Sequence, residues 1–116
     1  MRPAHRLHRR SEFLRVQRTG WRQRTAHFAI YLALFSDQTA PRLGVTVSRE
    51  IGNAVVRNRV KRRLRESFRR TLRELLMPAA GLVIVARAGA DELAMPAVCA
   101  ELSPALINLV GKIEAR

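Results

Sequence analysis

The 116-residue chain contains a single cysteine, which excludes an internal disulfide bond. Cys99 lies among alanine and valine residues, and this setting favours a small buried apolar residue over a reactive thiol. The three histidines, His5, His8 and His27, have no zinc-like spacing with Cys99. We therefore predict no metal ion held by the protein itself.

Long apolar runs are also missing from the sequence. The longest, residues 28–35 and 79–86, are far shorter than the roughly 18 residues that a membrane-spanning helix needs. The N-terminus is basic but lacks the apolar segment of a secretory signal. We therefore predict a cytoplasmic protein, and the length is that of one domain with a modest core.

The residue patterns that carry catalysis are absent as well. The sequence has no paired-carboxylate motif, no Ser-His-Asp set with recognisable flanking residues, no phosphate-binding glycine loop and no metal-ligand cluster. No catalytic residue is therefore predicted in this chain.

Acidic residues are scarce, since nine Asp and Glu stand against 22 Lys and Arg, a net charge of +13. The positive charge is concentrated: residues 1–24 contain eight Arg and one Glu, whereas residues 74–116 contain three cations and five acids. Nearly all the cations are arginine, whose planar guanidinium binds phosphate through two parallel hydrogen bonds and stacks on bases. A GC-rich genome gives the same arginine bias, so composition alone leaves both explanations open.

Residues 52–73 form the most informative segment, and their periodicity predicts an amphipathic helix. Apolar residues recur every three or four positions, at Val56, Val60, Leu64, Phe68, Leu72 and Leu75. Asn53 precedes this run and is a favourable N-cap, while Pro78 and Gly81 are expected to end the helix. The apolar stripe must face a core.

The rest of this helix surface is almost purely cationic. Glu66 is the only acid among Arg57, Arg59, Lys61, Arg62, Arg63, Arg65, Arg69, Arg70 and Arg73. A solvated helix face normally mixes charges, so the clustering of one sign favours a polyanion partner over a merely soluble surface. One row of polar residues contains Arg57, Lys61 and Arg65, and a neighbouring row contains Asn58, Arg62 and Arg69. Two such rows could hold two different segments of nucleic acid.

The N-terminal part of the chain predicts an arm followed by a short helix. Residues 1–10 are rich in Arg and His, lack a core pattern and are expected to form a basic flexible arm. Ser11 is expected to cap a helix that Gly20 ends. Phe13, Leu14 and Val16 lie near one face of this helix, and Phe13 and Val16 could simply be core residues.

Alternation of apolar residues predicts a strand over residues 27–34. Phe28, Ile30, Leu32 and Leu34 would face the core. The other face carries Tyr31 among small residues, so its ring is either open to a base or half-buried in the sheet. Residues 21–25 are expected to form a short first strand, in which Trp21 is either a packing residue or a nucleotide platform.

Two further strands and a C-terminal helical region complete the pattern. Residues 43–48 alternate and present small side chains on their second face, and residues 82–86 form an apolar run typical of a buried strand. Asp91 is expected to cap a helix carrying Leu93, Val98 and Leu102, and Pro104 to break it and start a last helix. The whole order indicates a single-domain α+β sandwich, with helices packed on one sheet.

One long motif resembles a known family. Residues 52–68 read G-N-A-V-V-R-N-R-V-K-R-R-L-R-E-S-F, and the preceding residues 42–48 read R-L-G-V-T-V-S. Together they resemble the signature of the protein subunit of bacterial ribonuclease P, centred on Arg57-Asn58-Arg59. The resemblance implies a two-layer, ribosomal-protein-like sandwich with a left-handed β-α-β crossover, which the residues alone do not predict.

The resemblance also implies a function. In this family the RNA subunit cleaves precursor tRNA at the 5′ end with Mg²⁺ that the RNA holds, and the protein binds both that RNA and the substrate's 5′ leader. We hypothesise that the catalytic RNA is bound by Arg57, Asn58, Arg59, Arg62 and Arg63. The leader would be bound by Phe13, Tyr31, Lys61, Arg65 and Arg87.

The chain departs from the family pattern at Gln17, where the family often has a second aromatic residue. Part of the stacking surface of the leader site is therefore in question. The alternative function is a ribosomal-type protein that binds rRNA and supports no reaction, because the charge and the fold fit it as well. A DNA-compacting protein fits less well, since the sequence shows no dimerisation element and no groove-reading helix.

Overall fold

The computed structural model describes residues 6–7 and 9–115. Three α-helices and four strands follow one another in the order α1 (Arg10–Thr19), β1 (Trp21–Arg24), β2 (Phe28–Leu34), β3 (Arg42–Thr46), α2 (Ala54–Arg70), β4 (Ala80–Ala86) and α3 (Met95–Glu114). Two short 3-10 helices, η2 (Leu72–Leu75) and η3 (Ala90–Glu92), flank β4. The predicted α+β class and the four predicted strands are confirmed.

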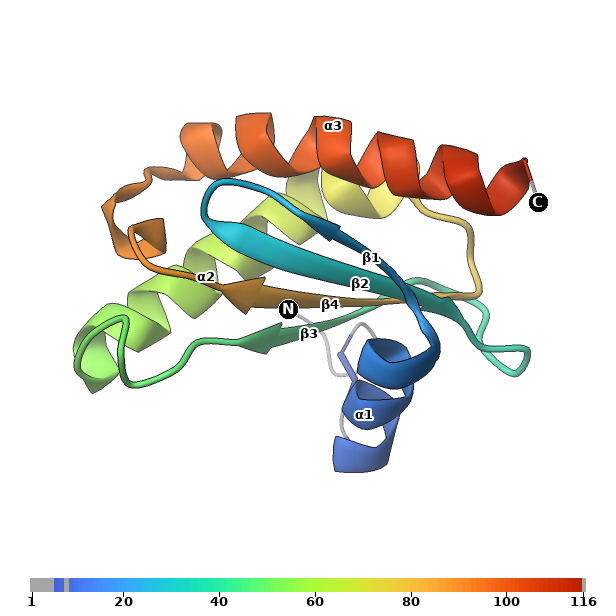
Figure 1. The fold of residues 1–116 in the computed structure, drawn as a ribbon, viewed down its shortest axis with the longest axis horizontal. Helices are drawn as coiled ribbons and strands as arrows, with labels where there is room; N and C mark the ends of the chain where they lie inside the picture. The colour runs from blue at the N-terminus through green and yellow to red at the C-terminus, as the bar shows by residue number, and fades with distance from the viewer. Residues whose placement is uncertain (1–5, 8, 116) are drawn as a thin grey trace.

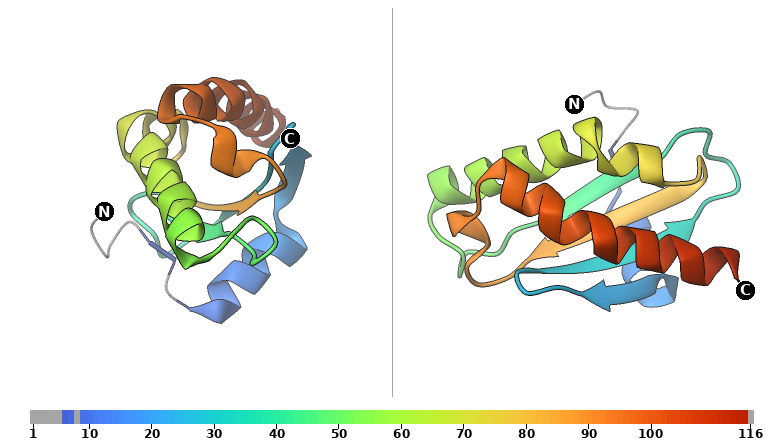
Figure 2. Two further views of the ribbon diagram at one scale, coloured as in Figure 1. Left: turned by 90° about the vertical axis from the view of Figure 1, so that its left-hand side faces the viewer. Right: turned by 90° about the horizontal axis from the view of Figure 1, so that it is seen from above.

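The four strands form one mixed sheet in the order β1-β2-β4-β3. β2 pairs antiparallel with both β1 and β4, whereas β3 pairs parallel with β4. Helix α2 makes the connection from β3 to β4, and the right-hand view of Figure 2 shows that this crossover is left-handed. Such connections are nearly always right-handed, so this unusual feature follows from the resemblance and not from general rules.

The helices lie on both faces of the sheet. Helices α2 and α3 cover one face, and α1 lies against the other, as Figure 1 shows. The main core lies between the sheet and α2 with α3, and its largest buried side chains include Phe28, Ile30, Leu32, Leu64, Phe68, Leu102 and Leu106. A smaller cluster under α1 contains Leu7, Val16, Ala33, Phe35 and Val83. Helix α1 therefore adds a partial third layer to the predicted sandwich.

Helix α2 begins as predicted but ends earlier. The Asn53 side chain accepts a hydrogen bond from the Val56 amide at 3.0 Å, which confirms the N-cap. The α-helix stops at Arg70, because Thr71 leaves the helical conformation with φ −132°. The 3-10 helix η2 follows, and this tighter turn keeps Leu72 and Leu76 buried.

Three predictions for the N-terminal half are wrong. Ser11 does not cap α1, since the helix begins at Arg10 and the Glu12 carboxylate accepts the Arg9 amide at 3.1 Å instead. Leu7 is not part of a flexible arm, because its side chain is buried and its amide donates to the Leu43 carbonyl at 3.0 Å. Residues 1–5 and 8 of the predicted arm lie outside the described residues. Leu34, predicted as core, is exposed at the last position of β2.

The predicted C-terminal geometry is also wrong, because α3 continues through Pro104 without a break. Leu102, Ala105, Leu106 and Leu109 are buried on both sides of the proline. Burial of the three leucines together contributes roughly 4.5–9 kcal/mol, which outweighs the cost of about 3 kcal/mol for one interior proline. Asp91 lies in η3 and not at a helix N-terminus, and α3 begins at Met95.

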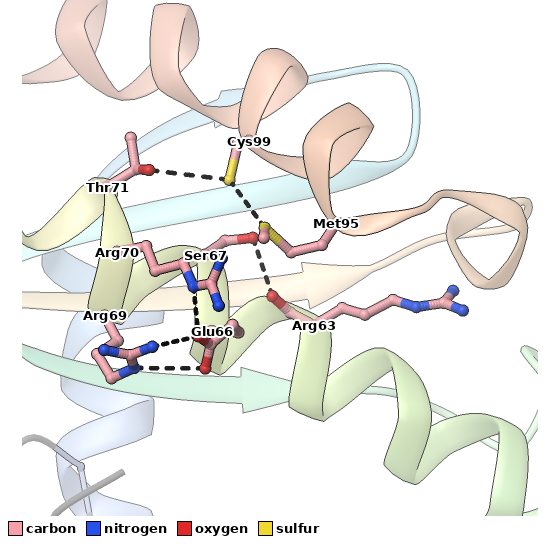
Figure 3. A network of polar contacts seen from close by, with 8 residues as sticks. All are labelled: Arg63, Glu66, Ser67, Arg69, Arg70, Thr71, Met95 and Cys99. Atoms are coloured by element: carbon pink, nitrogen blue, oxygen red, sulfur yellow. Dashed lines mark hydrogen bonds and ion pairs between the residues drawn. The ribbon is translucent and has the colours of Figure 1, made fainter.

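Cys99 is partly buried between α3 and the end of α2. Its sulfur lies 3.6 Å from the Met95 sulfur and 4.0 Å from the Thr71 hydroxyl, as shown in Figure 3.

Within the described ranges, none of the helices is both long and apolar enough to traverse a bilayer.

Candidate nucleic-acid interface

The residues predicted to bind the catalytic RNA lie in the first half of α2. Asn58 and Arg62 are exposed, whereas Arg57 and Arg59 are partly buried. The Nε atoms of Arg57 and Arg59 are buried and have no hydrogen-bond partner in the part of the chain that the structure describes. The first two turns of α2 therefore present several cations that no described acid neutralises.

Arg63 differs from its neighbours because its guanidinium has a structural role. Its Nη1 donates to the main-chain carbonyls of Asp91 at 3.0 Å and Leu93 at 2.8 Å. These two bonds fasten α2 to the segment between β4 and α3, a contact between residues about 30 positions apart that periodicity does not reveal. A contact of Arg63 with RNA stays a prediction.

Glu66 neutralises part of the second half of α2. Its carboxylate accepts hydrogen bonds from Arg69 and, at 2.5 Å, from Arg70 (Figure 3). The bonds from these two guanidinium groups lower the pKa of Glu66 to about 2. The unpaired cations of α2 are therefore more concentrated toward its N-terminal half.

Arg65, from the row of Arg57, Lys61 and Arg65, lies near the outer edge of β3, where residues 6 and 7 pair with Leu43. Arg65 is partly buried, and burial together with the nearby charge of Arg6 lowers its pKa. The main chain of Arg6 forms a parallel β-bridge with Leu43 of β3. Two neighbouring guanidinium groups at a sheet edge form a favourable position for a phosphate group.

Phe13 forms one wall of a hollow on the α1 face of the sheet. The hollow has a volume of about 420 Å³ and is lined by Arg10, Phe13, Leu14, Gln17 and Thr46. The Phe13 ring lies over Gly44, whose missing side chain leaves room for it. The small second face of β3, noted in the sequence, therefore lets a helix side chain approach the strand closely.

Tyr31 lies on the same face of the sheet as Phe13. Its ring is partly buried and packs against the cluster under α1 that contains Val16 and Val83. The half-buried sheet position weighed from the sequence is therefore confirmed. Contact with a nucleotide stays a prediction, since part of the ring is accessible.

Arg87 lies just beyond the end of β4 and is exposed. Its amide donates to the His27 carbonyl at 2.8 Å, which fixes its main chain. It lines a hollow of about 230 Å³ together with residues of the loop before α2, including Ser48, Glu50 and Ile51. Arg87 therefore lies near the start of the basic helix, although it comes from a different strand.

Two arginines on the α1 face of the sheet, where Phe13 and Tyr31 lie, were not predicted from the sequence as site residues. Arg22 and Arg24 of β1 are exposed, and Arg22 lies opposite Tyr31 in the sheet. The signal was available in the alternation of residues 21–24, W-R-Q-R, which places both arginines on one face. The pairing of Arg22 with Tyr31, however, could be known only from the structure.

No group of three or more His, Cys, Asp or Glu side chains within residues 6–7 and 9–115 is arranged to hold a metal ion. The prediction that Mg²⁺ belongs to an RNA partner is not tested by this observation.

The family model for ribonuclease P matches residues 1–110. The chain belongs to the ribonuclease P protein family. The ribonuclease P protein component of Syntrophobacter fumaroxidans is 40% identical over 112 residues, which cover 97% of this chain and 93% of that protein. The component from Geobacter sp. strain M21 is 44% identical over 109 residues, covering 94% and 91%.

Solved structures of ribonuclease P proteins show the same fold. The protein from Thermotoga maritima is 27% identical and superposes with a TM-score of 0.77, covering 89% of this chain and 96% of that one. The protein from Staphylococcus aureus is 25% identical with a TM-score of 0.76, covering 94% of each chain. The fold and the family predicted from the resemblance are therefore confirmed.

Proposed function

We propose that this chain is the protein subunit of ribonuclease P, which binds the catalytic RNA subunit and the 5′ leader of precursor tRNA. In this role it promotes maturation of the tRNA 5′ end and acts in the cytoplasm. Membership of the ribonuclease P protein family supports the proposal. The observation that carries it is the concentration of unpaired cations in the first half of α2, together with the partly accessible rings of Phe13 and Tyr31 on the α1 face of the same sheet.

The first half of α2 and the surface around Phe13 and Tyr31 suit two different RNA partners. Arg57, Asn58, Arg59 and Arg62 project from α2, and we assign them, with Arg63, to the folded RNA subunit. Phe13, Tyr31, Lys61, Arg65 and Arg87 are assigned to the leader. A single-stranded leader has exposed base faces and flexible phosphates, so aromatic rings and cations can hold it without reading its sequence.

The protein contributes binding and electrostatics, while the chemistry belongs to the RNA. Mg²⁺ bound by the RNA subunit would supply the activated water and stabilise the developing charge at the cleaved phosphate. Cations of this chain would neutralise phosphates of both RNAs where these approach each other. Because this lowers their mutual repulsion, less Mg²⁺ is needed for the substrate to bind.

The proposal is tested by cleavage of precursor tRNA with the matching RNA subunit at low Mg²⁺, with and without this chain. The expected result is strong stimulation by the protein. A variant in which Arg57, Asn58 and Arg62 are changed to alanine should lose the stimulation, whereas Lys112→Ala, in the last turn of α3, should retain it. Absence of stimulation by the wild-type protein would contradict the proposal.

Co-purification separates the proposal from its alternative. A ribonuclease P subunit should be recovered with one catalytic RNA, whereas an rRNA-binding protein should be recovered with intact ribosomal subunits. Recovery with ribosomal subunits alone would favour the alternative.

A further inference from the structure

Arg22 and Arg24 of β1 are exposed and belong to neither of the two proposed RNA-binding sets. Trp21 packs against the main core, and the Gln23 side chain accepts a hydrogen bond from Asn108 of α3 at 2.6 Å. These two residues therefore face α3. Because side chains alternate along a strand, Arg22 and Arg24 project from the opposite face, where α1 and Tyr31 lie.

Both arginines are exposed and lack an ion pair or a side-chain hydrogen bond to any described residue. Helix α1, which lies on their face of the sheet, contributes one acid, Glu12, and that residue is paired with Arg42 at 3.6 Å. The two guanidinium groups are therefore available to an anion from outside the chain.

The strand register places both arginines at the end of rows that cross the whole sheet. One row consists of Gly44, Val83, Tyr31 and Arg22, and the next consists of Thr46, Val85, Ala29 and Arg24. Each row spans three strand spacings, about 14 Å at roughly 4.8 Å per spacing. Both rows begin at β3, where Arg6 pairs with Leu43 and lies near Arg65. Both end at β1, the opposite edge of the sheet.

We infer that Arg22 and Arg24 bind phosphates of the 5′-distal nucleotides of the precursor leader, after the leader has crossed the sheet from β3 to β1. This rests on the proposed function, in which the catalytic RNA docks on the first half of α2. The cleaved bond then lies on the β3 side. The nucleotides nearest the cleavage site pass Lys61 and Arg65, the next ones pass Phe13 and Tyr31, and the distal ones reach β1.

A competing explanation is that these arginines only protect the exposed edge of β1 from pairing with other chains, as charged edge residues often do. That role predicts aggregation when they are removed and no dependence on the length of a leader. The leader-binding role predicts such a dependence, so substrate length separates the two.

The experiment measures binding of the reconstituted holoenzyme to precursor tRNAs with short leaders of two or three nucleotides and with leaders of ten or more. For the long leader, Arg22→Ala/Arg24→Ala should weaken binding roughly three- to tenfold, as expected for two exposed charge contacts. For the short leader, the affinity should match that of the wild type. The control Lys112→Ala removes an exposed cation of α3 and should bind both substrates like the wild type.

Salt dependence gives a second readout. A single-stranded site loses about 0.7 from the slope of log affinity against log salt for each phosphate contact removed, so the double variant should lose about 1.4 with the long leader. The slope with the short leader should not change. Arg22→Lys/Arg24→Lys should restore most of the slope, because lysine keeps the charge.

The outcomes distinguish the two proposals. If wild-type holoenzyme favours long leaders and the double alanine variant retains that preference in full, the inference about β1 is overturned while the proposed function stands. If the wild type does not bind precursor more tightly than mature tRNA, the proposed function fails first. Equal weakening for both leader lengths would also overturn the inference.

Discussion

Phe13 of α1 lies directly over Gly44 of β3, so that a methyl group at Gly44 would come within 2.6 Å of the ring carbons Cε1 and Cζ. We predict that Gly44→Ala displaces the ring, because the two groups cannot occupy the same space. The ring is only partly buried and can swing outward, so the free energy of unfolding should fall by about 1–2 kcal/mol. Binding of precursor tRNA should weaken while binding of the RNA subunit is retained.

The matched control is Gly111→Ala. Gly111 lies within α3, and a methyl group there would meet no atom within 4 Å. Because alanine is favoured over glycine inside a helix, stability should rise by roughly 0.5–1 kcal/mol without a change in RNA binding. Urea unfolding and filter binding measure both effects. Unchanged precursor affinity in Gly44→Ala would show that the position of the Phe13 ring does not matter for the leader.

Arg62 and Arg63 are adjacent cations with different expected roles. We predict that Arg63→Ala lowers the free energy of unfolding by roughly 1–3 kcal/mol, because the carbonyls of Asp91 and Leu93 lose a charged donor. Arg62→Ala should change stability by less than about 0.5 kcal/mol, since Arg62 is exposed. Its effect should instead be weaker binding of the RNA subunit. Equal stability of the two variants in urea unfolding would be incompatible with the structural role of Arg63.

Glu101 of α3 holds the turn between β1 and β2. Its carboxylate accepts hydrogen bonds from the Thr25 hydroxyl at 2.5 Å and the His27 amide at 2.8 Å, and it lies 2.6 Å from His27 Nδ1. Burial raises the pKa of Glu101, but the hydrogen bonds from Thr25 and His27 lower it more. The net pKa lies below the ordinary 4.5.

The lowered pKa fixes the sign of the pH dependence. A carboxyl group whose pKa is lower in the folded state stabilises the fold above its unfolded pKa, and this contribution is lost as the pH falls through the folded value. We predict that Glu101→Gln costs roughly 1–3 kcal/mol at pH 7 and that its difference from the wild type shrinks below about pH 4.5. Urea denaturation of both proteins at pH 7, 5, 4 and 3 measures this difference in the free energy of unfolding. Glu66, which titrates in the same acid range, is present in both proteins and cancels in the comparison.

Tyr31→Ala should weaken binding of precursor tRNA and leave binding of mature tRNA unchanged. Stacking of a base on an aromatic side chain contributes about 1–3 kcal/mol, so the loss for precursor should be roughly 5- to 150-fold. Tyr31→Phe retains the ring and should bind like the wild type. If both tRNAs lose affinity equally in Tyr31→Ala, Tyr31 does not belong to the leader site.

Patterns within one element were predictable from the sequence. The apolar spacing of α2 predicted that Val60, Leu64 and Phe68 would be buried, and Asn53 is its N-cap as expected. The alternation of β2 placed Ile30 and Tyr31 on opposite faces. These predictions succeed because they depend on periods of 3.6 and two residues, which the local chain sets by itself.

Contacts between distant elements were not predictable in the same way. Pro104 is a helix breaker by its own chemistry, yet buried neighbours on α3 keep the helix intact. Leu7 is buried only because α1 folds over it, and Arg63 reaches carbonyls of a loop about 30 residues away. The left-handed crossover follows from neither propensity nor periodicity. Each depends on tertiary packing, which a single sequence does not display.

The pairing of residues 6 and 7 with β3 has a practical consequence for how the protein is handled. Leu7 is hydrogen-bonded at the β3 edge, and Arg6 lies close to Arg65. An affinity tag fused ahead of Met1 would therefore extend a segment anchored beside the proposed entry point of the substrate. The C-terminal end of α3 lies on the sheet face opposite α1 and at the other end of the molecule from the start of α2, so it is the better attachment point for a fluorophore or purification handle.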